Sequence, residues 1–184
     1  MFRRLLVLSA VLLSSAVSPA KAQFPPLEAV PYVDVNRYMG TWYEIATIPQ
    51  PFQARCEGGV TAQYRLMPDG SVNVYNACQT RRGTIFASEG RGFVVNPGYN
   101  SKLDVSFVSA GGRWLFRGDY WIIELGANYE YAVIGDPSRS FGWILSRTCS
   151  LPVETLNGIF SRLTANGYDV STFEMTDQAA FGCR

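Results

Sequence analysis

The sequence predicts an all-β protein: an eight-stranded antiparallel up-and-down barrel with one C-terminal α-helix packed outside it and a short ninth strand. Two features of the composition favour strands joined by turns. Aromatic residues make up 14% of the 184 residues, and glycine and proline together number 27. The third observation is periodicity, because eight short strand patterns precede a single helical one. A β-sandwich with a helical appendage fits the same pattern and is the structural alternative.

The predicted strands share β-branched and aromatic residues and are separated by turn formers. They are expected at residues 41–48, 60–66, 71–76, 84–95, 102–108, 120–125, 129–135 and 141–147. The run Met67-Pro68-Asp69-Gly70 is typical of a type I turn, so the second and third strands should form a hairpin. In the fifth strand Leu103, Val105 and Phe107 alternate with polar residues, which indicates one inward face.

A helical period replaces the strand pattern at residues 152–166. Apolar side chains recur there at three- and four-residue spacings, at Val153, Leu156, Ile159, Phe160 and Leu163. Ser150 or Leu151 is expected near the N-cap, and Gly167 should end the helix. Residues 170–176 are expected to form the short ninth strand.

Residues 1–22 have the pattern of a secretory signal peptide. Arg3 and Arg4 precede an apolar segment at 5–17 that is too short to span a membrane, and Ala20-Lys21-Ala22 fits the small-residue cleavage rule. The domain should therefore comprise residues 23–184 and be periplasmic or secreted. No cysteine follows the apolar segment, so no stable membrane anchor is expected.

The charge and the chemistry-bearing residues exclude several classes of function. The chain has 16 basic and 15 acidic residues, and removal of residues 1–22 leaves 13 and 15, which is not the basic footprint of a nucleic-acid binder. The sequence contains no histidine, and its four cysteines have no CxxC spacing. We therefore expect no metal, no cofactor and no histidine-assisted catalysis. Cys56, Cys78, Cys149 and Cys183 should form disulfides in an oxidising compartment.

Three runs carry a family resemblance. Residues 34–46, which contain Gly40-Thr41-Trp42, resemble the first signature of the lipocalin family, most closely in the bacterial lipocalins and apolipoprotein D. Residues 129–136 are similar to its second motif, and residues 141–147 are similar to its third, a basic residue that ends strand eight. The resemblance covers nearly all of 33–178. It implies that Gly40, Trp42 and Arg147 form the structural signature, with Arg147 stacked across the Trp42 indole at the closed end.

The resemblance also implies a function, which is to bind a fatty acid, lysophospholipid or similar lipid inside the barrel for transport, storage or membrane maintenance. Strand parity, checked against the family pattern, proposes the cavity residues Phe52, Ala62, Val74, Asn76, Ser88, Val105, Phe107, Tyr120, Ile122, Ile134 and Trp143. Glu124 is placed inward by the same parity, and Phe52 is expected over the mouth. Bacterial members are often lipoproteins with a cysteine at the mature N-terminus, which this sequence lacks, so their outer-membrane anchoring is not carried over.

Two other functions stay open beside the lipid carrier. One is a lipocalin-fold enzyme that uses a free, inward-facing cysteine, which requires an activated thiol. The other is a protein-binding module that acts through its surface. Because all four cysteines can pair and histidine is absent, we expect a binding protein and not an enzyme.

The predicted disulfides are Cys56–Cys78 and Cys149–Cys183. If the first hairpin turns at Pro68-Asp69, Cys78 faces position 59, which is three residues from Cys56. Cys149 should lie at the opposite end of the barrel from Cys78, which is too far for a bond. The resemblance to apolipoprotein D favours Cys56–Cys183 instead, because a similar Thr-Asp-Gln precedes its tail cysteine.

Overall fold

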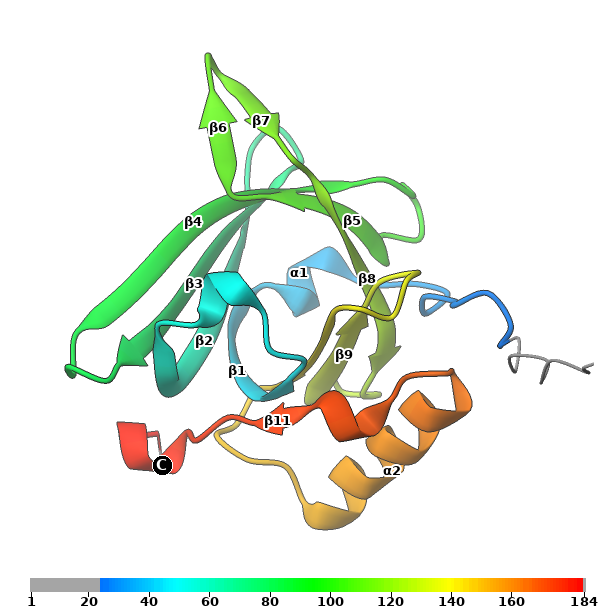
Figure 1. Cartoon of the computed structure of the whole chain (residues 1–184). Coiled ribbons are helices and arrows are strands. Elements are labelled where there is room, and N and C mark those ends of the chain that lie inside the picture. Colours follow the sequence, from blue (N-terminus) through cyan, green and yellow to red (C-terminus); the bar gives the residue numbers. More distant parts are fainter. Residues whose placement is uncertain (1–23, 184) are drawn as a thin grey trace, which may run out of the picture.

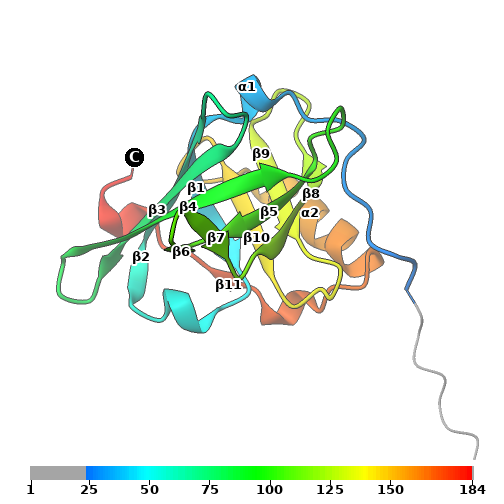
Figure 2. The ribbon, with the colours of Figure 1, turned by 90° about the horizontal axis from the view of Figure 1, so that it is seen from above.

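The computed structural model describes residues 24–183, and the predicted signal peptide lies outside them. Eight antiparallel strands form a barrel, because β10 at one edge of the sheet pairs back to β1 (Figures 1 and 2). This closure excludes the sandwich. The strands of the wall are β1 (Gly40–Thr47), β2 (Cys56–Leu66), β3 (Val72–Thr80), β4 (Ile85–Val94), β5 (Lys102–Ser106), β8 (Gly118–Leu125), β9 (Tyr131–Gly135) and β10 (Gly142–Ser146).

The two ends of the barrel differ. Helix α1 (Val35–Tyr38) lies at the closed end, called the floor below. The other end, called the mouth, carries the loop with the short helix η1 (Pro51–Gln53), the β3–β4 turn, the β9–β10 loop and a hairpin of β6 (Val108–Ala110) and β7 (Arg113–Leu115). The hairpin projects away from the barrel on the side opposite α2 (Figure 1).

The β6–β7 hairpin corrects the predicted fifth strand, which was expected to run to residue 108. The strand ends at Ser106, whose hydroxyl donates to the Val108 carbonyl and accepts from the Val108 amide. This local bonding competes with the ladder. Gly111 and Gly112 both have positive φ and close the hairpin turn.

Helix α2 (Val153–Ala165) packs outside the barrel. Its buried residues Ile159 and Leu163 lie in a cluster with Ile45, Val133 and Ile144, which are on the outer face of the wall. The N-cap is Pro152 and not Ser150 or Leu151. Its fixed φ suits the first turn, and its carbonyl accepts from the amide of Leu156.

The expected ninth strand is shorter than predicted. Asp169 accepts from the backbone amide of Ser171, which favours a turn, so residues 170–172 form the 3-10 helix η2 (Val170–Thr172). Strand β11 (Glu174–Met175) then pairs with β1, and η3 (Ala179–Phe181) follows against β2. Among residues 24–183, no helix is long and apolar enough to cross a membrane.

A bulge in β8 overturns the inward position predicted for Glu124. Ile122 stands opposite Ile134, but Glu124 stands opposite Val133, so the strand carries an extra residue between them. The shift turns Glu124 to the outer face. There its carboxylate accepts from the Tyr131 hydroxyl and pairs with Arg162 of α2.

The structure contains the disulfides Cys56–Cys78 and Cys149–Cys183, with Cα–Cα distances of 5.5 and 5.7 Å, and no free cysteine among residues 24–183. The pairing is as predicted, but the register behind it differs. The β2–β3 ladder pairs Leu66 with Val72, so an unbroken register would place Cys78 opposite position 60 and not 59. Two irregularities in β2 then bring Cys56 within reach.

Candidate functional site

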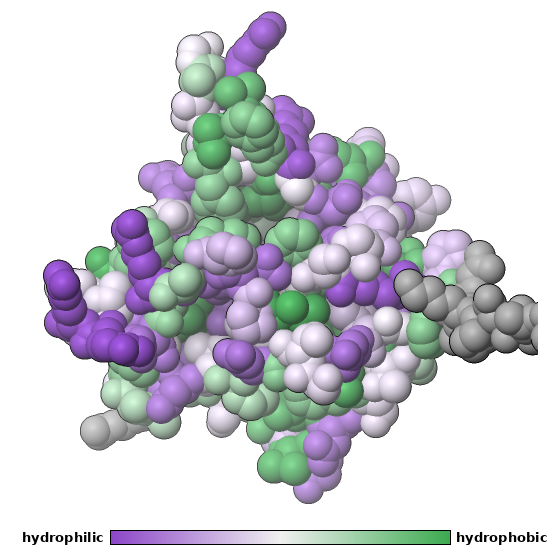
Figure 3. All heavy atoms as spheres, viewed as in Figure 1, coloured by the Kyte–Doolittle hydropathy of each residue, from purple (hydrophilic) through white to green (hydrophobic). Residues whose placement is uncertain are grey.

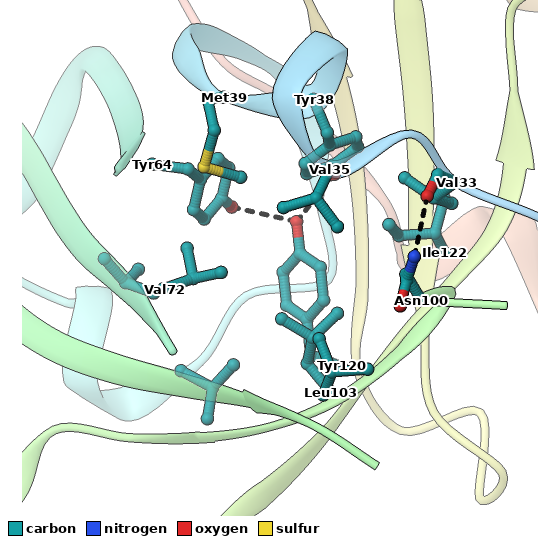
Figure 4. Close-up of a pocket in the computed structure, with 13 residues that line it drawn as sticks. Val33, Val35, Tyr38, Met39, Tyr64, Val72, Asn100, Leu103, Tyr120 and Ile122 are labelled. Carbon is teal, nitrogen blue, oxygen red and sulfur yellow. Dashed lines mark hydrogen bonds between the residues drawn. The ribbon is translucent and has the colours of Figure 1, made fainter. Parts of the chain in front are cut away.

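The floor of the barrel is almost filled. The cavity there has a volume of about 20 Å³, which accommodates roughly one water molecule. The lining is apolar except for three tyrosines and one asparagine. It comprises Val33, Val35, Tyr38, Met39, Tyr64, Val72, Val74, Val94, Asn100, Leu103, Val105, Tyr120 and Ile122 (Figure 4).

The three tyrosines join different elements across the floor. The Tyr120 hydroxyl of β8 lies 2.8 Å from that of Tyr38 in α1 and 2.9 Å from that of Tyr64 in β2 (Figure 4). Burial raises the pKa of Tyr64 to about 12 and raises the pKa values of Tyr38 and Tyr120 well above their usual value. All three phenols are therefore neutral at physiological pH, and they tie α1 to the wall.

The signature pair lies at this closed end. The Arg147 guanidinium lies 3.7 Å from the centre of the Trp42 ring, and Trp42 is fully buried. The same guanidinium donates to the carbonyls of Thr41, Tyr38 and Met39. The stacking implied by the resemblance is confirmed, and the hydrogen bonds show that Arg147 also holds α1 in place.

The mouth half of the interior carries more polar groups. Asn76 stands opposite Ala62 and Ser88 in the two ladders of β3, and residues directly opposite share a face. Ala62 belongs to the interior core, so Asn76 and Ser88 face inward too. The Asn76 Oδ1 atom is buried and has no hydrogen-bond partner among the described residues. A buried acceptor of this kind is costly unless a donor reaches it.

Phe107 also turns into the mouth half. A Cβ atom added to Gly90 would lie 2.7 Å from the Phe107 ring, so the ring covers the space that glycine leaves on the inner face of β4. The Phe107 side chain is still 43% exposed. It therefore presents an aromatic edge at the entrance, in a position that a larger residue at 90 would not allow.

A carboxylate network crosses the wall near the mouth. Glu44 is buried in β1, and its carboxylate accepts from the Thr176 hydroxyl at 2.6 Å and from Gln53 Nε2 at 3.0 Å. Gln53 Oε1 in turn accepts from the Trp143 indole at 3.4 Å. Burial raises the pKa of Glu44, and the two hydrogen bonds partly oppose this.

The structure divides the predicted cavity residues by depth. Val74, Val105, Tyr120 and Ile122 line the floor cavity. Ala62 and Ile134 are buried in the interior core. The remaining inward residues, which lie nearer the mouth and are partly exposed, are Asn76, Ser88, Phe107 and Trp143.

Phe52 lies on the loop at the mouth, as predicted from its place in the first loop, but it points largely into solvent. Its side chain is 61% exposed on η1, and its neighbour Gln53 makes the inward contact instead. Sequence reasoning also missed Tyr38 and Thr176, which lie outside the predicted barrel strands. The pattern of the first signature, which begins with a helix-capping Asp34, was the available signal for Tyr38.

The described residues hold no group of three or more histidine, cysteine, aspartate or glutamate side chains placed to bind a metal ion. The interior combines apolar walls with a few polar groups, a composition that is typical of ligand pockets.

Comparison with known families and proteins supports this description. The model of the Lipocalin-like domain family matches residues 33–178. The chain is 37% identical to temperature-induced lipocalin-1 of Arabidopsis thaliana over 158 residues, which is 83% of each chain. It is 37% identical over 146 residues, 79% of each chain, to the outer membrane lipoprotein Blc of Escherichia coli K12.

Apolipoprotein D of Mus musculus is 33% identical over 168 residues, with 86% of this chain and 83% of that protein covered. Among solved structures, insecticyanin from the tobacco hornworm Manduca sexta superposes with a TM-score of 0.68 at 20% identity, over 88% of this chain and 89% of that one. The structural likeness is to the fold alone at this level of identity.

Proposed function

The chain belongs to the lipocalin family, whose members bind small hydrophobic ligands, and we propose that it carries a fatty acid, a lysophospholipid or a similar lipid inside its barrel. The observation that carries the proposal is the interior itself. Its inward face is largely apolar, and hydrogen bonds fix several of its few polar groups, among them Tyr120 and the Trp143 indole. This is the arrangement that orients one head group above a buried chain.

The filled floor decides where such a ligand would lie. A cavity of about 20 Å³ has no room for an acyl chain, so the chain would occupy the mouth half between Asn76, Phe107 and Trp143. Burial of ten methylenes stabilises a complex by roughly 8 kcal/mol at about 0.8 kcal/mol each. Association costs of roughly 4–15 kcal/mol oppose it, which leaves micromolar to submicromolar binding within reach.

We propose a binding role and not thiol catalysis. All four cysteines are in disulfides and the sequence has no histidine, so no activated nucleophile of the Cys-His type is available. A thiol titration of the native protein tests this: one reactive thiol per chain would favour the enzyme.

We also propose that the protein works in the periplasm or outside the cell, in transport, storage or membrane maintenance. The signal-peptide pattern of residues 1–22 supports export. Two disulfides suit an oxidising compartment. The similarity to an outer membrane lipoprotein points in the same direction.

Tryptophan fluorescence tests the proposed ligand class. Oleate and a lysophospholipid should quench it with saturable binding tighter than about 100 μM, a free energy of roughly −5.5 kcal/mol. Trp143→Phe should remove most of the change because Trp143 faces the mouth half. Trp121→Phe is the matched control, since Trp121 lies on the outer face under Lys102. Absence of saturable binding by either lipid in that range would exclude the lipid carrier.

A further inference from the structure

Glu44 is the one buried carboxylate of the barrel interior among the described residues. The residue is only 4% exposed. The ion pairs found in residues 24–183 are Arg81–Glu57, Arg91–Asp69 and Arg162–Glu124, so no cation compensates Glu44. A buried carboxylate without a counter-ion is unfavourable, and it retains a strong field because little water screens it.

The position of Glu44 directs that field into the mouth half. Trp42, two residues earlier in β1, is in the interior core, whereas the next residue, Ile45, packs against α2 outside. Glu44 therefore continues the inward face toward the mouth. Its link through Gln53 to the indole of Trp143 places the carboxylate beside the inward wall of β10.

The groups around the carboxylate are neutral donors and aromatic faces. Burial raises the pKa of Glu44, and the hydrogen bonds that Thr176 and Gln53 donate partly offset this rise because they stabilise the ionised carboxylate. Phe141 and Trp143 stack at the mouth with ring centroids 6.1 Å apart and an interplanar angle of 22°. An aromatic face attracts a cation and a carboxylate repels an anion, so both features favour the same sign of ligand charge.

We propose that Glu44 sets the charge preference of this lipocalin, so that an amphiphile with an ammonium head group binds more tightly than a carboxylate with the same alkyl chain. The ammonium would lie at the mouth, against the Phe141–Trp143 pair and within the field of Glu44. The inference rests on the proposed function, because it names the head group that the lipid site prefers.

A matched twelve-carbon series tests the proposal by titration calorimetry at pH 7.5. Dodecylammonium should bind at least about tenfold more tightly than tridecanoate, which carries the same twelve-carbon alkyl chain, a difference of about 1.4 kcal/mol. Glu44→Gln keeps the shape and removes the charge, and it should reduce this ratio about tenfold. The control Glu89→Gln makes the same change of net charge on the exposed face of β4, where Glu89 bonds only Asn73, and should leave the ratio unchanged.

The neutral lipid 1-dodecanoylglycerol distinguishes a failure of the charge preference from a failure of the proposed lipid-carrier function. If it binds but the ammonium-to-carboxylate ratio is the same in the wild type and Glu44→Gln, the charge preference is wrong and the lipid carrier stands. If no member of the series binds the wild type, the proposed function itself fails.

A second variant tests the charge of Glu44 without a substitution in β1, in case Glu44→Gln does not fold. Gln53→Arg places a guanidinium on the mouth loop, within reach of the carboxylate, and leaves β1 intact. It should neutralise the field and reduce the ratio as Glu44→Gln does. An unchanged ratio in a folded Gln53→Arg protein, checked by circular dichroism, would overturn the proposal.

Discussion

Arg147 shows how one side chain closes an end of the barrel. Its guanidinium covers the Trp42 ring and donates to backbone carbonyls at the junction of α1 and β1, including that of Arg37. Partial burial lowers its pKa, but an arginine stays charged at any physiological pH. The planar guanidinium therefore both covers the Trp42 indole and donates several hydrogen bonds to backbone carbonyls.

Replacement of Arg147 by alanine should destabilise the fold by about 1–3 kcal/mol, a typical loss for a named structural defect. Arg147→Lys should recover only part of the loss, because an ammonium cannot reproduce the fork. Urea unfolding measures both. Lipid affinity should change little, since Arg147 lies at the floor. Arg82→Ala on the exposed β3–β4 turn is the control. An unchanged stability of Arg147→Ala would show that the stacking on Trp42 does not stabilise the fold.

Glu44 should make the stability of the protein depend on pH. Burial raises its pKa above the unfolded value, so the folded state binds a proton more tightly than the unfolded state does. Its contribution is therefore fully present below about pH 4.5 and is lost as pH rises through the raised folded pKa. The stability of Glu44→Gln relative to the wild type should increase with pH above 4.5. Urea unfolding between pH 4 and pH 8 tests this, and a pH-independent difference would show that the pKa is not raised.

At the scale of elements, the wall between β1 and β2 is completed by the C-terminal segment. The β1–β2 ladder covers only Gly40–Tyr43 of β1. Beyond it, the Thr176 amide donates to the Ile45 carbonyl, and the Gly59 amide of β2 donates to the Asp177 carbonyl, both at 2.9 Å. The side-chain amide of the buried residue Gln178 donates to the backbone carbonyls of Glu44 and Val60. The segment thus satisfies backbone groups that the diverging strands leave open.

The disulfide Cys149–Cys183 should hold this segment in place. The double variant Cys149→Ser/Cys183→Ser should lose up to roughly 3–4 kcal/mol in the chain-entropy model. Hydrogen exchange gives the sharper readout, because the Gly59 amide is protected by Asp177 of the segment. It should exchange faster in the variant, while the amides of the β3–β4 ladder stay protected. Equal protection of Gly59 in both proteins would mean that the segment stays docked without the disulfide.

At the scale of the molecule, hydrophobic side chains collect around the mouth. Val108, Leu115 and Phe116 of the β6–β7 hairpin are exposed, Phe116 to 85%, and the hairpin forms a largely hydrophobic projection in the surface view (Figure 3). The floor, in contrast, is sealed by α1 and the tyrosines. The barrel is therefore a container closed at the floor, and the β6–β7 hairpin adds exposed apolar side chains at its mouth.

A ligand held in such a container should stabilise the whole barrel. At a free concentration one hundred times its dissociation constant, a lipid adds about 2.7 kcal/mol to the free energy of unfolding. For a domain of this size, that corresponds to a rise in Tm of roughly 5–10 °C. Differential scanning fluorimetry with and without lipid measures it. A lipid that quenches Trp143 without raising Tm would be bound at the surface and not inside.

Local chemistry in the sequence was enough to predict much of this protein. Alternation of apolar residues indicated the inward positions of Val74, Asn76 and Ile122, because side chains on a strand point to opposite faces in turn. The helical period located α2 to within a residue at each end. The signature residues Trp42 and Arg147 indicated the closed end and the contact that seals it.

Only the tertiary structure decided the features that depend on contacts between distant segments. The bulge that turns Glu124 outward arises from pairing with β9, which no local pattern encodes. The sequence could not show whether Glu44 is solvated, because the residues that bury and bond it, Gln53 and Thr176, come from a loop and from a segment 132 positions away. Alternation states which way a side chain points. The free energy of a buried charge depends on what the folded chain brings around it.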